Sequence, residues 1–513
     1  MRDGQAAVIA FLADPAAYGG APVERIDTHA SIVFLAGQRA YKLKRAVRYD
    51  YLDFSTPERR RACCEAEVRL NRRTAPALYR GVLPVARHVD GSLTLGGGGT
   101  PVDWVVAMNR FPQEAVFDRL AVAGRLDPDL MPPLAASIAA FHATAAPRPD
   151  HGGRAGMAWV IEGNAAGFAE FGNGCLDRSA AARAIDDARG ELDRRAALLE
   201  RRRAAGLVRQ CHGDLHLRNI VLLDGRPTLF DAIEFNDEIA CIDVLYDLAF
   251  LLMDLWRRRL PRHANAVWNR YLAETTDFGG VALLPLFLSC RAAVRAKTSA
   301  TAARLQPEKD TRHSELQDLA REYLAMAQAL LHPPDASLIA VGGFSGSGKS
   351  TLAQALAPSV GAVPGAVLLR SDEIRKRLLG VPMLEPLGAE GYAPEVSRRV
   401  YALLAERAAA IIREGHSVVV DAVHAREEDR RAIEEVAARL SRTFVGFWLE
   451  APESVLIARA EPRRNDPSDA DAAVIRAQRA QGTGEIGGWL RVDASAPPSD
   501  VLRHALALVS HRS

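Results

Sequence analysis

The chain has 513 residues, of which 48% are hydrophobic, and its 65 Lys and Arg residues nearly balance its 63 Asp and Glu residues. A single hydrophobic core stops growing at about 250–300 residues, so we expect two or three domains. The missing basic excess argues against a dedicated nucleic-acid binder. The most apolar stretch, residues 244–256, contains two aspartates and is shorter than the roughly 20 apolar residues that cross a bilayer. We therefore expect a multidomain globular protein without a nucleic-acid or membrane partner.

The cysteines and the N-terminus indicate a compartment. None of the six cysteines forms a CxxC pair, and none lies at zinc-ligand spacing from a histidine. The first residues lack the apolar run of a signal peptide. We expect reduced thiols and a cytoplasmic protein.

The first 330 residues fall into two regions of different periodicity. Residues 31–35 and 39–44 predict strands around a Gly37-Gln38 turn, and Ser55 with Glu58 predicts the start of a helix through a capping box. A further strand is expected over residues 102–108. Residues 1–110 thus predict a β-rich small lobe with one helix, and residues 111–330 a mainly helical large lobe.

A second domain is expected after residues 331–337, where Pro333 and Pro334 prevent helix continuation and predict a linker. Residues 338–513 then alternate strands with helices, the strands being expected at residues 338–341, 367–369, 417–420 and 443–449. This alternation is typical of a parallel sheet covered by helices on both faces. The predicted fold class is a multidomain α/β and α+β protein.

One group of polar residues in the large lobe has the spacing of a phosphoryl-transfer site. Asp214 follows His212-Gly213, Asn219 lies five residues later, and Asp231 ends an apolar run. An aspartate at that point can accept the proton of an attacking hydroxyl. The asparagine and the second aspartate can hold the Mg²⁺ that bridges ATP phosphates.

These residues and their surroundings resemble the aminoglycoside phosphotransferase family, which has a protein-kinase-like fold, over roughly residues 1–330. The resemblance implies that Asp214 is the catalytic base, that Asn219 and Asp231 are magnesium ligands, and that Asp247 supports the loop structurally. It also implies a strand lysine that contacts the α- and β-phosphates, and a helix glutamate that pairs with it. Lys42 and Glu67 fit these two roles, with Lys44 and Glu65 as rivals.

Two departures separate this region from protein kinases. No G-x-G-x-x-G covers the phosphates, and the corresponding turn is expected at residues 28–31. Asp231-Ala232-Ile233 replaces Asp-Phe-Gly. Both departures resemble small-molecule kinases of this fold. The alternative is a pseudokinase that binds ATP without transferring phosphate.

A second and unrelated signature is a complete Walker A sequence between residues 343 and 351, placed after a predicted strand and before a predicted helix. Its glycines let backbone N–H groups converge on phosphate oxygens at a helix N-terminus. Lys349 is expected to reach the β- and γ-phosphates of ATP, and Ser350 to bind Mg²⁺. The predicted nucleotide-binding residues are Gly343, Ser345, Gly346, Ser347, Gly348, Lys349, Ser350 and Thr351.

The rest of this domain resembles small-molecule P-loop kinases, the group that contains gluconate kinase, shikimate kinase and zeta-toxin-like kinases. The resemblance implies that Asp372 is a catalytic base, that Arg375 clamps the substrate, and that Asp421 holds Mg²⁺ through water in the Walker B role. Arg459 and Arg463 would neutralise charge at the γ-phosphate. The alternatives are a helix N-cap for Asp372 and solvated helix faces for the arginines.

The whole chain resembles bacterial predicted kinases that fuse these two domains. We expect a bifunctional ATP-dependent kinase for small hydroxylated metabolites. One alternative is a single active kinase with an ATP-sensing regulatory domain, and another is a nucleotide-binding module of a toxin or stress system. The basic residues that follow Asp247, such as Arg257, Arg295 and Lys297, favour a sugar or sugar acid over a polycationic aminoglycoside. The oligomeric state is left open.

Overall fold

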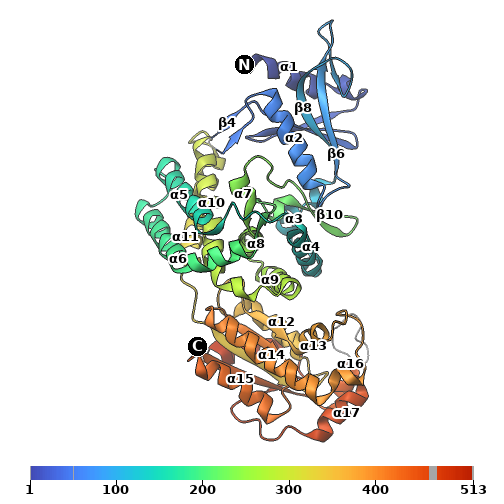
Figure 1. Cartoon of the computed structure of the whole chain (residues 1–513), viewed down its shortest axis with the longest axis vertical. Coiled ribbons are helices and arrows are strands. Elements are labelled where there is room, and N and C mark those ends of the chain that lie inside the picture. The colour runs from blue at the N-terminus through green and yellow to red at the C-terminus, as the bar shows by residue number, and fades with distance from the viewer. Residues whose placement is uncertain (1, 50, 461–470, 511–513) are drawn as a thin grey trace. The chain divides into compact units, whose positions relative to one another are not determined.

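The computed structural model describes residues 2–49, 51–460 and 471–510. The chain divides into two compact units, one formed by Met1–Gly163 with Leu192–Asp254 and the other by Asn164–Glu191 with Leu255–Ser513 (Figure 1). The linker expected at residues 331–337 connects a helix to a strand inside the second unit. The domain boundaries set from the sequence stay a prediction.

A six-stranded antiparallel sheet with strand order β1-β2-β3-β8-β6-β7 forms the small lobe. Helix α2 packs against β8 and β6, and it carries one buried face of Cys64, Glu67 and Val68 toward the sheet. The elements of this lobe are α1 (Arg2–Ala13), β1 (Val23–Asp27), β2 (Ser31–Ala36), β3 (Arg39–Lys44), β4 (Arg48–Tyr49), β5 (Leu52–Asp53), α2 (Pro57–Asn71), β6 (Tyr79–Arg87), β7 (Leu93–Leu95) and β8 (Thr100–Asn109).

Two details of the small lobe correct the sequence prediction. The described part of the lobe has two α-helices, α1 and α2, where one was expected. The cap of α2 is Thr56, whose hydroxyl accepts from the Arg59 amide, whereas Ser55 donates to Asp53. Both Ser55 and Thr56 are good N-caps, and Pro57 at the first helical position selects the residue directly before it.

The helical region carries the catalytic segment between two short strand pairs. β9 (Val208–Gln210) pairs with β12 (Cys241–Asp243), and β10 (Ile220–Leu223) pairs with β11 (Arg226–Leu229), so the residues expected at the site lie in the connections. The helices are α3 (Phe117–Val122), α4 (Met131–Thr144), α5 (Gly153–Phe171), α6 (Arg178–Ala204), α7 (Asp237–Ala240), α8 (Val244–Arg257), α9 (Pro261–Thr275), α10 (Leu284–Arg304) and α11 (Thr311–Leu330).

A five-stranded parallel sheet with strand order β14-β15-β13-β16-β17 forms the core of the C-terminal region, which confirms the predicted fold class. Its strands are β13 (Ser337–Gly343), β14 (Val367–Arg370), β15 (Val418–Asp421), β16 (Thr443–Glu450) and β17 (Leu490–Asp493). Its helices are α12 (Lys349–Leu356), α13 (Ser371–Leu378), α14 (Pro394–Arg413), α15 (Glu427–Arg439), α16 (Glu453–Ala460), α17 (Ala472–Gln481) and α18 (Pro498–Ser510).

One helical stretch among the described residues, Phe278–Arg304, has the length and apolar composition to cross a membrane. In the structure 72% of its most apolar window is buried. Burial of this extent is the pattern of a core helix.

Helix α9 closes one edge of the parallel sheet with side-chain amides, and both elements belong to the second unit. Asn269 accepts from the Leu368 amide at 2.6 Å and donates to the Ala366 carbonyl at 3.2 Å. Asn265 donates to the Ala366 and Pro364 carbonyls at 3.1 and 3.2 Å. β14 is the edge strand, so these amides take the place of a missing neighbouring strand and protect the edge from other chains. The P-loop sheet therefore depends on a helix that precedes the predicted linker.

We expect Asn269→Ala to lower the free energy of unfolding of the second unit by about 1–3 kcal/mol, because it leaves a strand N–H without its acceptor. Thermal and urea denaturation of the full chain measure this loss. Asn173→Ala, which removes an exposed asparagine that accepts from Arg178, is the matched control and should change stability by less than about 0.5 kcal/mol. Equal effects of the two substitutions would contradict the role given to α9.

Candidate active sites

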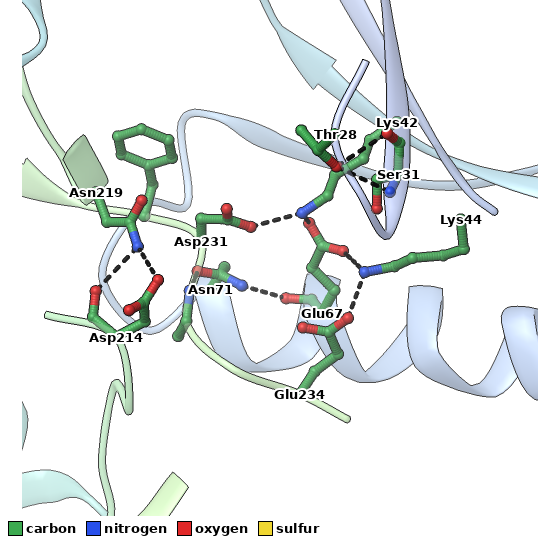
Figure 2. Close-up of polar contacts among 12 residues, drawn as sticks. Thr28, Ser31, Lys42, Lys44, Glu67, Asn71, Asp214, Asn219, Asp231 and Glu234 are labelled. Atoms are coloured by element: carbon green, nitrogen blue, oxygen red, sulfur yellow. Dashed lines mark hydrogen bonds and ion pairs between the residues drawn. The ribbon is translucent and has the colours of Figure 1, made fainter. Parts of the chain in front are cut away.

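The first site is built around Glu67 on α2, a residue that is fully buried (Figure 2). Lys42 on β3 donates to Glu67 Oε1 at 2.9 Å and to Asp231 Oδ1 at 2.5 Å. The ammonium of Lys42 thus joins the sheet, the helix and the segment after β11. Glu65, the rival of Glu67, pairs with Arg61 on the exposed face of α2.

Lys44 is not left free by this arrangement, and Figure 2 shows it on the other side of Glu67. Its ammonium contacts Glu67 Oε2 and Glu234 Oε1, and only 2% of its side chain is exposed. Strand alternation places Lys42 and Lys44 on the same face of β3, so both reach one carboxylate. The result is a row of alternating charges that runs from Asp231 through the two lysines to Glu234. Sequence reasoning had set the two lysines as rivals and had missed Glu234.

The charges of this row set the protonation state of its members. Burial alone would raise the pKa of Glu67, but Lys42 and Lys44 outweigh burial and lower that pKa to about 2. Burial would lower the pKa of Lys42, and Asp231 and Glu67 instead raise it well above its ordinary value. Burial raises the pKa of Glu234, with Lys44 acting against it. Glu67 and Lys42 are therefore charged at neutral pH.

A second buried carboxylate, Asp247 on α8, fixes the loop that carries Asp214. It accepts from the His212 and Gly213 amides at 3.1 and 2.8 Å and lies 3.0 Å from His142 Nε2. Gly213 has a φ of 82°, and a Cβ there would meet Ile233 and the Ile239 carbonyl at 3.1 Å, so the tight turn before Asp214 requires glycine.

His142, Cys211 and Asp247 lie close enough to suggest a metal cluster. Both oxygens of Asp247 already accept amide hydrogens, and burial raises the pKa of the Cys211 thiol well above its ordinary value. A thiol that keeps its proton is a poor metal ligand. The cluster is a hydrogen-bonded support of the loop.

Asp214 on this loop lies close to Asn219 and Asp231 (Figure 2). Asn219 Nδ2 donates to the Asp214 carboxylate at 3.0 Å and to the Asp214 carbonyl at 2.9 Å. Because this nitrogen is engaged, the metal-binding atom of Asn219 would be its oxygen Oδ1. The Asp231 side chain is 43% exposed, and its backbone has a φ of 62°, which aspartate tolerates. The amide oxygen of Asn219 and the exposed carboxylate of Asp231 are oxygen ligands that suit a magnesium ion.

The second site is the P-loop between β13 and α12. Gly348 is the N-cap of α12 with a φ of 88°, and Gly346 has a φ of 83° with no room for a Cβ against the Leu456 carbonyl. Lys349 Nζ donates to the Phe344 carbonyl at 3.1 Å, so the lysine lies across its own loop. Ser345 donates its amide to Gln478 of α17 at 2.9 Å. Gln478 follows Arg459 and Arg463 in the sequence, and no sequence pattern singled it out.

Two acidic side chains lie near this loop. Asp421 ends β15, and its carboxylate accepts from Arg370 Nε at 3.2 Å. Burial first, and repulsion by Asp421 second, raise the pKa of Asp372, while Lys349 acts against them. The structure thus places Asp372, Asp421 and Lys349 within electrostatic reach of one another, and a raised pKa suits a carboxylate for general-base work near neutral pH.

The arginines expected at this second site have other partners. Arg375 donates to the Gly391 carbonyl at 2.8 Å and stacks on Tyr392, so it holds a loop of its own domain. Arg459 donates to the Ala494 carbonyl at 2.7 Å. Arg463 lies outside the described residues.

Comparison with protein families defines the class of this protein. Residues 35–284 match the Phosphotransferase enzyme family, and residues 338–483 match an AAA domain. The chain is a phosphotransferase with a hydroxyl acceptor, in which a protein-kinase-like domain precedes a P-loop kinase domain, as the sequence resemblance predicted.

Relatives that match nearly the whole chain show which family it belongs to. An uncharacterized protein of Mycobacterium tuberculosis is 30% identical over 479 residues, which are 92% of each chain, and the same figures hold for one of Mycobacterium bovis. The chain belongs to the family of these mycobacterial proteins.

Solved structures of two kinases resemble separate parts of the chain. A gluconokinase from Sinorhizobium meliloti is 25% identical, covers 34% of this chain and 93% of its own, and gives a TM-score of 0.26. A choline/ethanolamine kinase family protein from Mesorhizobium loti is 14% identical, covers 64% of this chain and 99% of its own, and gives a TM-score of 0.35.

The lowered pKa of Glu67 predicts a pH-dependent contribution to stability. A carboxylate whose pKa falls from 4.5 to about 2 on folding stabilises the fold above pH 4.5 and loses that contribution as the pH falls toward 2. We expect Glu67→Gln to cost about 3 kcal/mol at neutral pH, since it leaves two buried lysines short of a partner. The difference from the unmodified chain, measured by urea denaturation, should shrink between pH 4.5 and 2.

Glu65→Gln is the control for this measurement, because Glu65 lies on the exposed face of the same helix. It should change stability by less than about 0.5 kcal/mol at every pH. A Glu67→Gln effect that is independent of pH would show that the lysines do not hold Glu67 ionised.

Proposed function

We propose that the chain is a bifunctional ATP-dependent kinase, in which each domain transfers the γ-phosphoryl group of ATP to a hydroxyl of a small metabolite. The observation that supports this most is that each domain holds its own set of phosphate-binding and proton-accepting groups. The first set is the row of charges around Glu67 with Asp214 and Asn219, and the second is the P-loop with Asp372 and Asp421.

In the first domain Lys42 would bind the α- and β-phosphates while Glu67 keeps it in place. Asn219 Oδ1 and Asp231 would hold Mg²⁺, which supplies positive charge to the phosphates when bound. Asp231 would exchange its bond to Lys42 for the metal, and Lys44 would keep Glu67 compensated during that exchange. Asp214 would accept the proton of the acceptor hydroxyl as its oxygen attacks the γ-phosphorus, and ADP leaves.

In the second domain the P-loop amides and Lys349 would bind the phosphates. Ser350 and Asp421 would hold Mg²⁺. Lys349 would leave the Phe344 carbonyl, which is a single hydrogen bond and therefore a small cost. Asp372 would take the acceptor proton. Arg459 and Arg463 would neutralise charge at the γ-phosphate once ATP is bound.

Two observations favour the alternative that the second domain senses ATP without transfer. Arg370 already pairs with Asp421, so the carboxylate proposed to hold Mg²⁺ is neutralised. Gln478 accepts a hydrogen bond from one amide of the P-loop, that of Ser345. In that case only the first domain would be a kinase, and ATP binding at the P-loop would regulate it.

The two candidates differ in a transfer assay on the full chain with γ-labelled ATP, magnesium and a panel of sugars, sugar acids, polyols and nucleosides. We expect two labelled products. Asp214→Asn should reduce one of them by about 10²–10⁴-fold, which is the usual contribution of a general base, and leave the other unchanged. Lys349→Ala should do the reverse.

Matched controls for charge loss are Asp224→Asn and Lys309→Ala, both at exposed positions. They should leave both products unchanged. If Asp214→Asn removes all transfer and Lys349→Ala only changes its ATP dependence, the regulatory alternative is correct. If neither variant changes transfer to any acceptor, the proposed function is wrong.

A further inference from the structure

Two tyrosines at the edge of the small lobe form an exposed aromatic surface. Tyr49 ends β4 and Tyr51 directly precedes β5, their rings are 10° from parallel, and their centroids are 5.8 Å apart. This separation is that of offset rings, so part of each ring face stays uncovered. The two residues are 41% and 39% exposed. We call the pair the tyrosine platform.

The tyrosine platform contacts two segments that border the first site. The ring centroid of Tyr49 lies 6.2 Å from that of His29, which belongs to the turn expected over the phosphates. The ring centroid of Tyr51 lies 6.3 Å from that of Phe235, the residue after Glu234. The backbone carbonyl of Tyr51 accepts a hydrogen bond from Asn236. These contacts fix the platform between the turn that follows β1 and the segment that follows Asp231.

His29 also lies near the loop that carries Asp214. Partial burial lowers the pKa of the His29 imidazole, and the negative charge of Asp214 acts on it in the opposite direction. His29 therefore lies within electrostatic reach of Asp214 while its ring contacts Tyr49. An acceptor that contacts His29 on the platform would lie within electrostatic reach of Asp214, the residue proposed as the base.

The described carboxylates of the hairpin and of the strand before the turn are both paired with arginines. Asp53 of the hairpin contacts Arg59 and Arg48 and accepts from Ser55. Asp27, before the turn, is paired with Arg25 and Arg45. Aromatic sites for cations combine ring faces with uncompensated negative charge, and these two carboxylates are already neutralised.

We infer that the tyrosine platform is the acceptor subsite of the first domain and that it binds the ring of a sugar. A pyranose has an apolar face of C–H groups and a rim of hydroxyls, which suits an exposed aromatic surface beside a carboxylate and an imidazole. Stacking positions the ring, and the hydroxyl nearest Asp214 loses its proton to that carboxylate as its oxygen bonds to the γ-phosphorus. The inference rests on the function proposed for this domain.

The test uses the full chain with D-glucose, D-galactose and D-mannose as ring probes, and with choline and glycerol as probes without a ring. We expect Asp214-dependent phosphorylation of at least one hexose. Tyr49→Ala and Tyr51→Ala should each raise the KM for that hexose about tenfold, with kcat and the KM for ATP little changed. Tyr49→Phe and Tyr51→Phe should restore the original KM, because the ring face and not the hydroxyl makes the contact.

Trp159→Ala is the control, since Trp159 is an aromatic residue of the same unit that is 46% exposed on α5. It should leave the KM for the hexose unchanged. Asp214-dependent transfer with an unchanged hexose KM in both Tyr→Ala variants would overturn the subsite, as would phosphorylation of choline in preference to every hexose. Either result would leave the proposed function standing.

Saturation-transfer NMR with the same hexoses separates the two claims when no transfer is found. Hexose binding that is lost in Tyr49→Ala and Tyr51→Ala would support the subsite while contradicting the proposed transfer. Absence of hexose binding to the unmodified chain would overturn the subsite directly.

Discussion

The buried carboxylate of Glu67 is the contact on which the first site depends. It has one lysine on each oxygen, so a helix, a strand and the segment after β11 meet at a single point. A buried carboxylate with one partner would lose its compensation whenever that partner turned to a phosphate, and leaving a buried charge unpaired is expensive. The second lysine removes this conflict. On the proposed function, Lys42 could then turn to ATP without leaving Glu67, and the helix that carries it, unpaired.

The second site solves the same electrostatic problem with backbone groups. Its proposed phosphate-binding groups are amides at a glycine-rich loop and a helix N-terminus, which need no buried counter-charge. What this site needs instead is a rigid sheet, and α9 contributes to that rigidity by occupying the edge of β14. The two phosphate sites therefore place different demands on the fold, which is a physical reason for two unrelated architectures in one chain.

The sequence predicted those parts of each site that are close together along the chain. The spacing from Asp214 to Asn219 and the residues of the P-loop are local patterns, and so are the strands that precede them. The contacts that were missed join residues far apart in sequence. Glu234 meets Lys44 across 190 positions, Asn269 meets Leu368 across 99, and Gln478 meets Ser345 across 133. No local spacing encodes such pairs. Arg375 was a plausible clamp by position, and in the structure its Nη1 donates to the Gly391 carbonyl and to Ser397 of its own domain.

The central claim, that the chain has two separate ATP sites, is tested most directly by counting bound nucleotide. Isothermal titration of the full chain with the non-hydrolysable analogue AMPPNP and magnesium needs no knowledge of either acceptor. The account predicts two sites per chain, one site in Lys42→Met, one in Lys349→Ala and none in the double variant. A single site in the unmodified chain, or loss of both sites in either single variant that remains folded, would contradict it.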